Sequence, residues 1–78
     1  MRVECKRDLV EVLKRLSVGA QNGRVRLIRL YLELGCSTDA FVLALAQAAR
    51  AWLELGTDPR SETGFEIEGR WYTWAKIR

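Results

Sequence analysis

Apolar and polar positions follow one another along the chain in a pattern that predicts three helices. The strongest signal is residues 39–55, DAFVLALAQAARAWLEL, whose polar side chains form one narrow stripe on a helical wheel while the rest of the circumference is apolar. A helix that is apolar nearly all round is buried on several sides. We therefore expect this helix to be the centre of the packing, with Gly56 as its C-terminal cap.

Two shorter helices are expected before it. Residues 4–16 place apolar side chains at the i, i+4, i+7 spacing of a helix with one buried face. Residues 17–23 contain glycines and an Asn-Gly pair and are expected to turn. A second helix over 24–34 is apolar on most of its surface and stops at Gly35, a residue type common just after a helix end.

The C-terminal segment 64–77 predicts a β-hairpin, preceded by a polar loop. Apolar and acidic residues alternate first, and aromatic and β-branched residues follow a Glu-Gly turn. Two registers are open: a four-residue turn pairs Ile67 with Tyr72, and a two-residue turn pairs Ile67 with Arg70. In either register the second strand is apolar on both sides, and one side is expected to cover the helices.

Length and composition indicate one globular domain, 1–78. The chain has 49% hydrophobic and 29% charged residues, values typical of a folded protein. No apolar run reaches the roughly 18 residues of a membrane span, and the N-terminus lacks the apolar core of a signal peptide. We therefore expect a cytoplasmic protein with no membrane contact, in which Cys5 and Cys36 are free thiols.

The residue types present argue against an enzyme. The chain has no histidine, which removes the commonest general base and the commonest metal ligand. Its two cysteines lack the spacing of a zinc site, and its serines and threonines have no histidine to activate them. Residues 19–23 lack the lysine of a phosphate-binding loop. We expect no catalysis, no metal and no cofactor.

The net charge of +3 is concentrated in the N-terminal half, a bias that permits nucleic-acid binding without requiring it. Three arginines stand within six residues of the second helix, at Arg24, Arg26 and Arg29. One interpretation is that they grip phosphates. The other is a solvated stripe in which Arg29 pairs with Glu33 one helical turn later.

The hairpin carries an unusual group of aromatic side chains. Trp71, Tyr72 and Trp74 stand within four residues, and the cations that flank them are Arg70, Lys76 and Arg78. Aromatics interleaved with cations are suited to stack on unpaired bases or to anchor a protein interface. A third interpretation is that the rings close the core, but both faces of one strand cannot pack on a single helical layer.

Three helices followed by a hairpin is the element order of winged-helix domains, and residues 34–41, LGCSTDAF, resemble the turn of a helix-turn-helix. The resemblance implies an α+β fold with 64–77 as the wing and with DNA read by the third helix. The outward stripe of that helix is Asp39, Leu43, Gln47, Arg50 and Glu54, with a net charge of −1. Phosphates repel such a stripe, so we expect the fold without the family's usual DNA contact.

These observations favour a small non-enzymatic regulatory protein that acts at DNA or in a nucleic-acid-bound complex. The alternative is a protein–protein adaptor or inhibitor, of the kind encoded by phages and mobile elements, that binds its partner through the Trp-rich hairpin. Excess apolar surface on the second and third helices also allows a homodimer. The candidate binding residues are Arg24, Arg26, Arg29, Arg70, Trp71, Tyr72, Trp74, Lys76 and Arg78.

Overall fold

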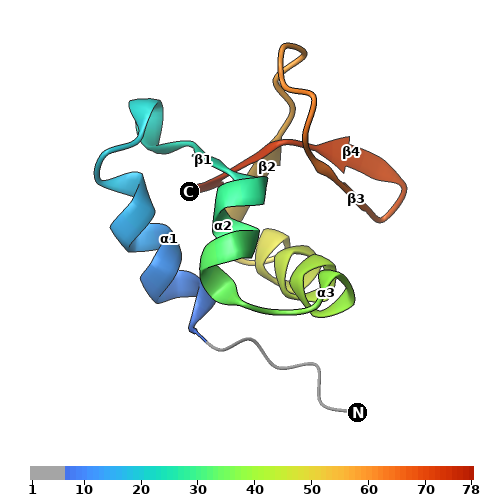
Figure 1. The fold of residues 1–78 in the computed structure, drawn as a ribbon, viewed down its shortest axis with the longest axis horizontal. Helices are drawn as coiled ribbons and strands as arrows, with labels where there is room; N and C mark the ends of the chain where they lie inside the picture. Colours follow the sequence, from blue (N-terminus) through green and yellow to red (C-terminus); the bar gives the residue numbers. More distant parts are fainter. Residues whose placement is uncertain (1–6) are drawn as a thin grey trace.

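The computed structural model describes residues 7–78, which form three α-helices and two small antiparallel sheets (Figure 1). The predicted α+β class is confirmed. The elements are α1 (Leu9–Ser17), the 3-10 turn η1 (Gln21–Gly23), β1 (Val25–Arg26), α2 (Leu27–Leu34), α3 (Thr38–Ala49), β2 (Leu53–Gly56), β3 (Phe65–Ile67), β4 (Arg70–Tyr72) and β5 (Trp74–Ile77). Across residues 7–78, no helix has the length and apolar character that a membrane crossing needs.

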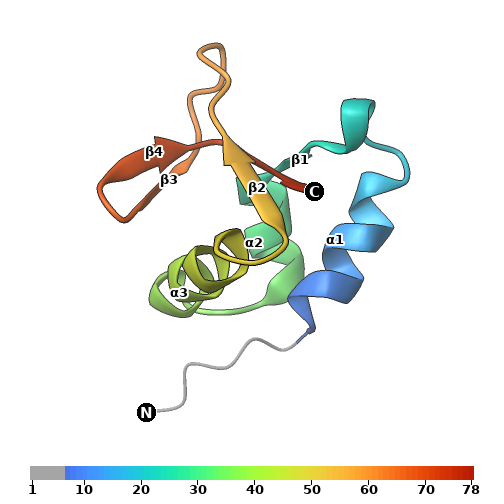
Figure 2. The ribbon, with the colours of Figure 1, turned by 180° about the vertical axis from the view of Figure 1, so that it is seen from behind.

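The strands pair differently from the predicted C-terminal hairpin. β5 lies between β1 and β2 in a three-stranded sheet, and only β3 and β4 form a hairpin. The prediction of one hairpin over 64–77 is therefore wrong for its last four residues, which leave the hairpin at Thr73. Figures 1 and 2 show the hairpin projecting above α3 on one side, while α1 lies on the opposite side next to β1.

The third helix is shorter than predicted. The prediction of a helix over 39–55 is wrong beyond Ala49, because Leu53–Gly56 form strand β2. The backbone of this segment pairs with β5, and Leu53 is fully buried there. Pairing with a distant strand has overridden the local helical pattern, so Gly56 ends a strand and is not a helix cap.

The first two helices also begin later than predicted. α1 starts at Leu9, where the carboxylate of Asp8 accepts a hydrogen bond from the backbone N–H of Val10; residues 4–6 of the predicted helix lie outside the described part. α2 starts after β1, because residues 25 and 26 pair with β5. Its predicted end is confirmed: Gly35 adopts φ 67°, the left-handed conformation of a helix-terminating glycine.

The β3–β4 hairpin has the two-residue turn. Ile67 pairs with Arg70, and the turn residues Glu68 and Gly69 both have positive φ, at 52° and 82°. Positive φ at both central positions is the geometry of a type I′ turn, whose twist matches that of the flanking strands. The structure thus decides between the two registers that the sequence left open.

The core lies between the helices and the inner face of the three-stranded sheet. Its fully buried large side chains are Phe41, Leu13, Leu27, Leu30, Leu34, Leu45 and Leu53. Phe41 packs edge-on against Tyr31 of α2 and Phe65 of β3, with ring centroids 5.3 Å and 4.8 Å away. One face of α3 thus belongs to the core, whereas Leu43 on its other face is 52% exposed.

Cys36 lies in the connection between α2 and α3 and is buried, at 8% exposure. It is disulfide-bonded, so the prediction of a free thiol is wrong for this residue. That prediction assumed a reducing compartment, where disulfides are rare. Cys5 lies outside the described residues.

Candidate functional site

The register of the three-stranded sheet sorts its side chains onto two faces, because successive residues of a strand point to opposite sides. Val25 and Leu55 both pair with Ala75, and this row belongs to the core. The next row pairs Arg26 with Trp74 and Trp74 with Gly56. This second row therefore lies on the outer face of the sheet, away from the helices.

The Trp74 ring is fixed against that outer face. A Cβ atom at Gly56 would overlap the ring, so the indole lies across β2 in the space that the glycine leaves. The guanidinium carbon of Arg24 stands 4.4 Å from the ring centroid, the geometry of a cation–π contact. Trp74 is half-buried between these neighbours.

A groove of about 690 Å³, here called the sheet groove, opens beside this ring. Its walls are the Trp74 row, the turn η1 and the loop 57–64; the lining residues are Gln21, Asn22, Arg24, Arg26, Asp58, Arg60, Ser61, Glu62, Thr63, Thr73 and Trp74. A smaller hollow shares Arg24 and Arg26 with it and adds Arg15 and Arg29. Five arginines and two carboxylates, Asp58 and Glu62, thus line this surface.

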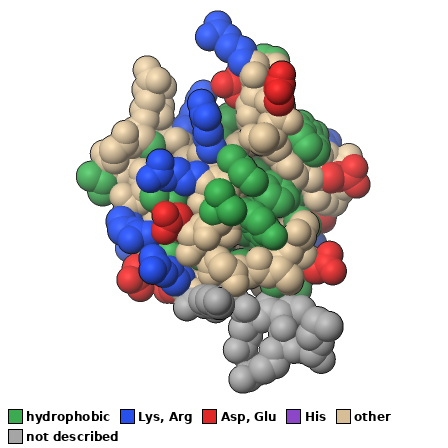
Figure 3. Space-filling model, viewed as in Figure 1, with side chains coloured by type: hydrophobic (Ala, Val, Ile, Leu, Met, Phe, Trp, Pro, Cys, Tyr) green, Lys and Arg blue, Asp and Glu red, His purple; other side chains and the backbone are tan. Residues whose placement is uncertain are grey.

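Most of these arginines are not neutralised by a neighbour. In the described part of the chain, no carboxylate lies within salt-bridge distance of Arg24, Arg26, Arg29 or Arg60, and all four side chains are exposed. In Figure 3, Lys and Arg side chains lie on the α1 and β1 side of the molecule, at the left of the view, with Asp and Glu side chains among them. Exposed cations without carboxylate partners are suited to bind phosphate.

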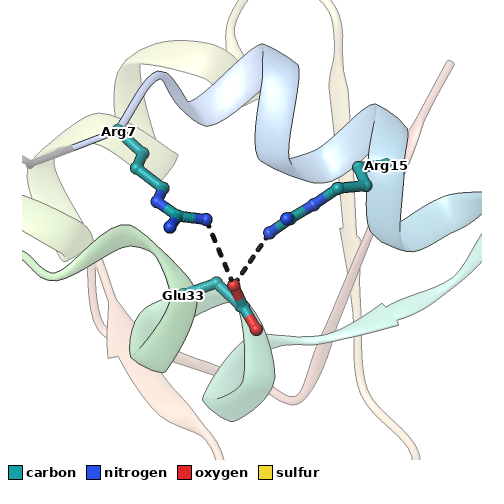
Figure 4. A network of polar contacts seen from close by, with 3 residues as sticks. All are labelled: Arg7, Arg15 and Glu33. Carbon is teal, nitrogen blue, oxygen red and sulfur yellow. Dashed lines mark hydrogen bonds and ion pairs between the residues drawn. The ribbon is translucent and has the colours of Figure 1, made fainter.

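Glu33 pairs with Arg15 of α1 and with Arg7, which precedes the helix. Its carboxylate lies 2.8 Å from the Arg15 guanidinium and 3.7 Å from that of Arg7, as Figure 4 shows. The predicted pairing of Arg29 with Glu33 is therefore wrong, whereas the exposure of Arg24, Arg26 and Arg29 agrees with a solvated stripe. Arg15, although it lines the smaller hollow, has its charge partly offset by this contact, whereas no carboxylate of the described residues pairs with Arg29.

The loop 57–64 is anchored by hydrogen bonds. The Thr57 hydroxyl donates to the carbonyl of Trp71 (2.6 Å), and the N–H of Asp58 donates to the hydroxyl of Thr73 (2.8 Å). Within the loop, the Asp58 carboxylate accepts from the N–H of Arg60 (3.0 Å). These contacts hold Arg60 at the wall of the sheet groove.

Thr73 is the residue at which the chain passes from the hairpin to the three-stranded sheet. It is 3% exposed, and all its polar groups are paired. Its N–H donates to the carbonyl of Gly56, and its carbonyl accepts from the N–H of Leu27, both at 2.9 Å. Together with the bond from Asp58, these contacts tie β2, α2 and the loop to one position next to Trp74.

The structure brings some of the predicted site residues together. Arg24, Arg26 and Trp74 meet in the sheet groove, and Arg29 lines the adjoining hollow. Lys76 lies two residues after Trp74 on β5 and therefore on the same outer face. These five residues form one surface, to which β1, α2 and β5 all contribute.

The other predicted residues lie elsewhere. Tyr72 packs against the core. The Arg78 guanidinium donates to the carbonyl of Ala49 at the C-terminal end of α3 (3.3 Å). Arg70 and Trp71 lie on the hairpin, where Trp71 is 49% exposed. The cations and aromatics of 70–78 therefore do not form a single site.

Four residues that line the sheet groove or the adjoining hollow were not predicted from the sequence: Arg15, Arg60, Gln21 and Asn22. Each stands in a segment that looks locally like a solvated helix face, a turn or a loop. Only the pairing of β5 with both β1 and β2 brings the loop next to the η1 turn. No short-range pattern in the sequence indicates that these strands pair.

The outward side of α3 offers no cationic surface. Asp39, Leu43 and Gln47 are exposed, and the Arg50 guanidinium lies 3.5 Å from the Glu68 carboxylate. Glu54, predicted on this stripe, lies on β2. Phosphate binding through α3 is therefore no better supported by the structure than by the sequence.

Comparison with protein families, curated proteins and solved structures finds no match to this chain. Among the described residues, no group of three or more His, Cys, Asp or Glu side chains is placed to hold a metal ion.

Proposed function

We propose that this chain is a small non-enzymatic regulatory protein that binds nucleic acid through the sheet groove. The observation that carries the proposal is the convergence of Arg24, Arg26 and Arg60 on one groove beside Trp74, with no described carboxylate paired to these arginines. Arginine contacts to phosphate supply most of the affinity of sequence-independent nucleic-acid binding. Stacking on an aromatic ring adds affinity for exposed bases.

We further propose a winged-helix type of arrangement for the fold. Three helices are followed by β2 and by a long connection that returns as β5 to pair with it. In this arrangement the wing is the connection 57–73, in place of the segment 64–77 that the sequence suggested. The groove on the outer face of the sheet replaces α3 as the contact surface, because α3 exposes Asp39 and Leu43.

Titration of fluorescent duplex and single-stranded oligonucleotides tests the binding proposal. We expect affinity to fall steeply between about 50 and 200 mM salt as counterions are released. The double variant Arg24→Ala/Arg26→Ala should bind more weakly and lower the slope of log K against log salt by about 2.

The matched control, Arg50→Ala/Arg70→Ala, removes the same charge from the other side of the molecule and should leave the slope nearly unchanged. The proposal is lost if neither form of nucleic acid binds above background at about 50 mM salt.

A second candidate function rests on Trp71. It is the exposed aromatic of the hairpin, at 49%, and its cross-strand neighbour on the outer face is Glu66. Exposed tryptophans commonly dominate the energy of protein interfaces. If the chain is an adaptor or inhibitor, Trp71→Ala should abolish the capture of a protein partner in the presence of nuclease, whereas Arg24→Ala/Arg26→Ala should retain it. A homodimer would instead appear as a change in solution mass with protein concentration.

A further inference from the structure

We infer that the sheet groove takes an unpaired nucleotide of a single-stranded segment, with its base against Trp74. This inference rests on the proposed function and names the class of nucleic acid that the site prefers. The Trp74 ring lies across the sheet over Gly56, and the guanidinium carbon of Arg24 stands 4.4 Å from the ring centroid. Indole rings and guanidinium planes both stack on nucleobases.

The ring is held in place before any ligand arrives. Gly56 leaves space for the indole on the outer face. Thr73, the residue before Trp74, is fixed by backbone and side-chain hydrogen bonds to three separate segments. A rigid aromatic loses little conformational freedom when a ligand binds. The indole is therefore in place before binding, and the exposed Arg24 side chain that lies over it moves aside when a base stacks.

The remaining walls supply the other groups that a nucleotide needs. Gln21 and Asn22 of η1 provide side-chain amides, and Ser61 and Thr63 provide hydroxyls. Amides and hydroxyls both donate and accept hydrogen bonds, as the polar edge of a base requires. Arg26 and Arg60 line the same groove and are available to phosphates, and the groove also contains the carboxylates of Asp58 and Glu62.

A duplex can use only part of this surface. Its bases are stacked on each other, so a duplex presents phosphates to the groove and leaves the face of Trp74 unused. Major-groove reading would require a helix that carries suitable side chains, and α3 exposes Asp39 and Leu43. A single strand can engage the ring, the amides and the arginines together.

The test compares a labelled single strand of about 12 nucleotides, within the usual site size of such proteins, with the duplex of the same sequence. We expect the single strand to bind more tightly. Trp74→Leu should weaken single-strand binding by about 5- to 150-fold, the range that corresponds to loss of one stacked base, and should weaken duplex binding much less, because the duplex loses only the positioning of Arg24. Trp74→Phe should retain most of the affinity, and Trp71→Leu is the matched control with no effect.

Equal or tighter duplex binding would overturn the inference, as would equal losses in the Trp74→Leu and Trp71→Leu variants. Competition by a free mononucleotide as strong as that of the oligonucleotide would also contradict a strand-bound nucleotide.

If Trp74→Leu does not fold, photocrosslinking of an iodouracil-containing strand to the unmodified protein replaces the variant. Trp74 as the crosslinked residue supports the inference, and Trp71 contradicts it. Failure of the proposed function is a different result, in which neither strand form binds.

Discussion

Trp71 and Trp74 stand three residues apart and occupy the outer faces of two different sheets. Both rings lie over a glycine: a Cβ atom at Gly64 would press on the Trp71 ring, and one at Gly56 would overlap the Trp74 ring. The two sites are thus built in the same way, with an aromatic side chain laid over backbone that has no side chain of its own.

Their cross-strand neighbours carry opposite charges. Trp74 has Arg24 over its ring and Arg26 as its cross-strand neighbour, whereas Trp71 has Glu66 as its cross-strand neighbour. An aromatic ring accepts a base or an apolar protein side chain equally well. The charges around the ring decide which of these approaches, because phosphates accompany every base.

The largest expected effect comes from reversing the charges beside Trp74. Arg24→Glu/Arg26→Glu should reduce nucleic-acid affinity by on the order of 100-fold or more, because two phosphate contacts become repulsions. The comparison variant, Arg50→Glu/Arg70→Glu, changes net charge equally on the hairpin side. At about 150 mM salt, where the Debye length is about 8 Å, it should have little effect; comparable losses in the two variants would mean that net charge, and not the groove, governs binding.

Gly56→Ala should damage the Trp74 site while leaving the Trp71 site intact. The added methyl group overlaps the indole and displaces it, at a cost of about 1–3 kcal/mol in the free energy of unfolding. Denaturant titration measures this cost, and oligonucleotide titration should show weaker binding as well. Gly19→Ala is the control, because a Cβ atom there meets nothing within 4 Å; equal stability of both variants would show that the ring does not depend on Gly56.

Thr73→Val tests the junction between the two sheets. Removing the hydroxyl leaves the part-buried N–H of Asp58 without its partner, which should lower the free energy of unfolding by about 0.5–1.5 kcal/mol. Thr73→Ser keeps the hydroxyl and should lose less. If the valine variant is as stable as the serine variant in a thermal melt, the hydrogen bond from Asp58 does not hold the loop.

The smallest expected effect is a gain. Glu66→Arg would give Trp71 a cationic cross-strand neighbour like that of Trp74, and affinity for single-stranded nucleic acid should rise by a few-fold at low salt, about what one added phosphate contact provides. Glu66→Gln separates the loss of repulsion from the new contact. A gain of the same size in both variants would show that charge removal alone suffices.

The tetrapeptide Leu-Glu-Leu-Gly occurs twice and shows how far the sequence predicts the fold. At 32–35 it ends α2 as predicted, with Gly35 in the left-handed conformation, because local periodicity and capping decide that end. At 53–56 the same four residue types form β2, because the backbone of this segment pairs with β5. That pairing joins residues about twenty positions apart, and no local pattern reports it.

The candidate site, like the fold, could be predicted from the sequence only in its locally visible part. Arg24, Arg26 and Trp74 were predicted because cations and aromatics are visible as residue types. Their meeting in one groove, and the addition of Arg60, depend on the position of β5 between β1 and β2. The sequence pattern predicted one strand over 70–77 and did not indicate that it is divided at Thr73. Because of this division, Trp71 and Trp74 lie on different surfaces.

The most direct test of the sheet groove as the contact surface is an NMR titration of the isotope-labelled protein with a short single-stranded oligonucleotide. The three tryptophans give separate indole N–H signals. We expect the signals of the Trp74 indole and of the backbone amides of Arg24 and Arg26 to shift with added strand, while the Trp71 indole signal stays in place. Shifts confined to Trp71 and the hairpin would contradict it.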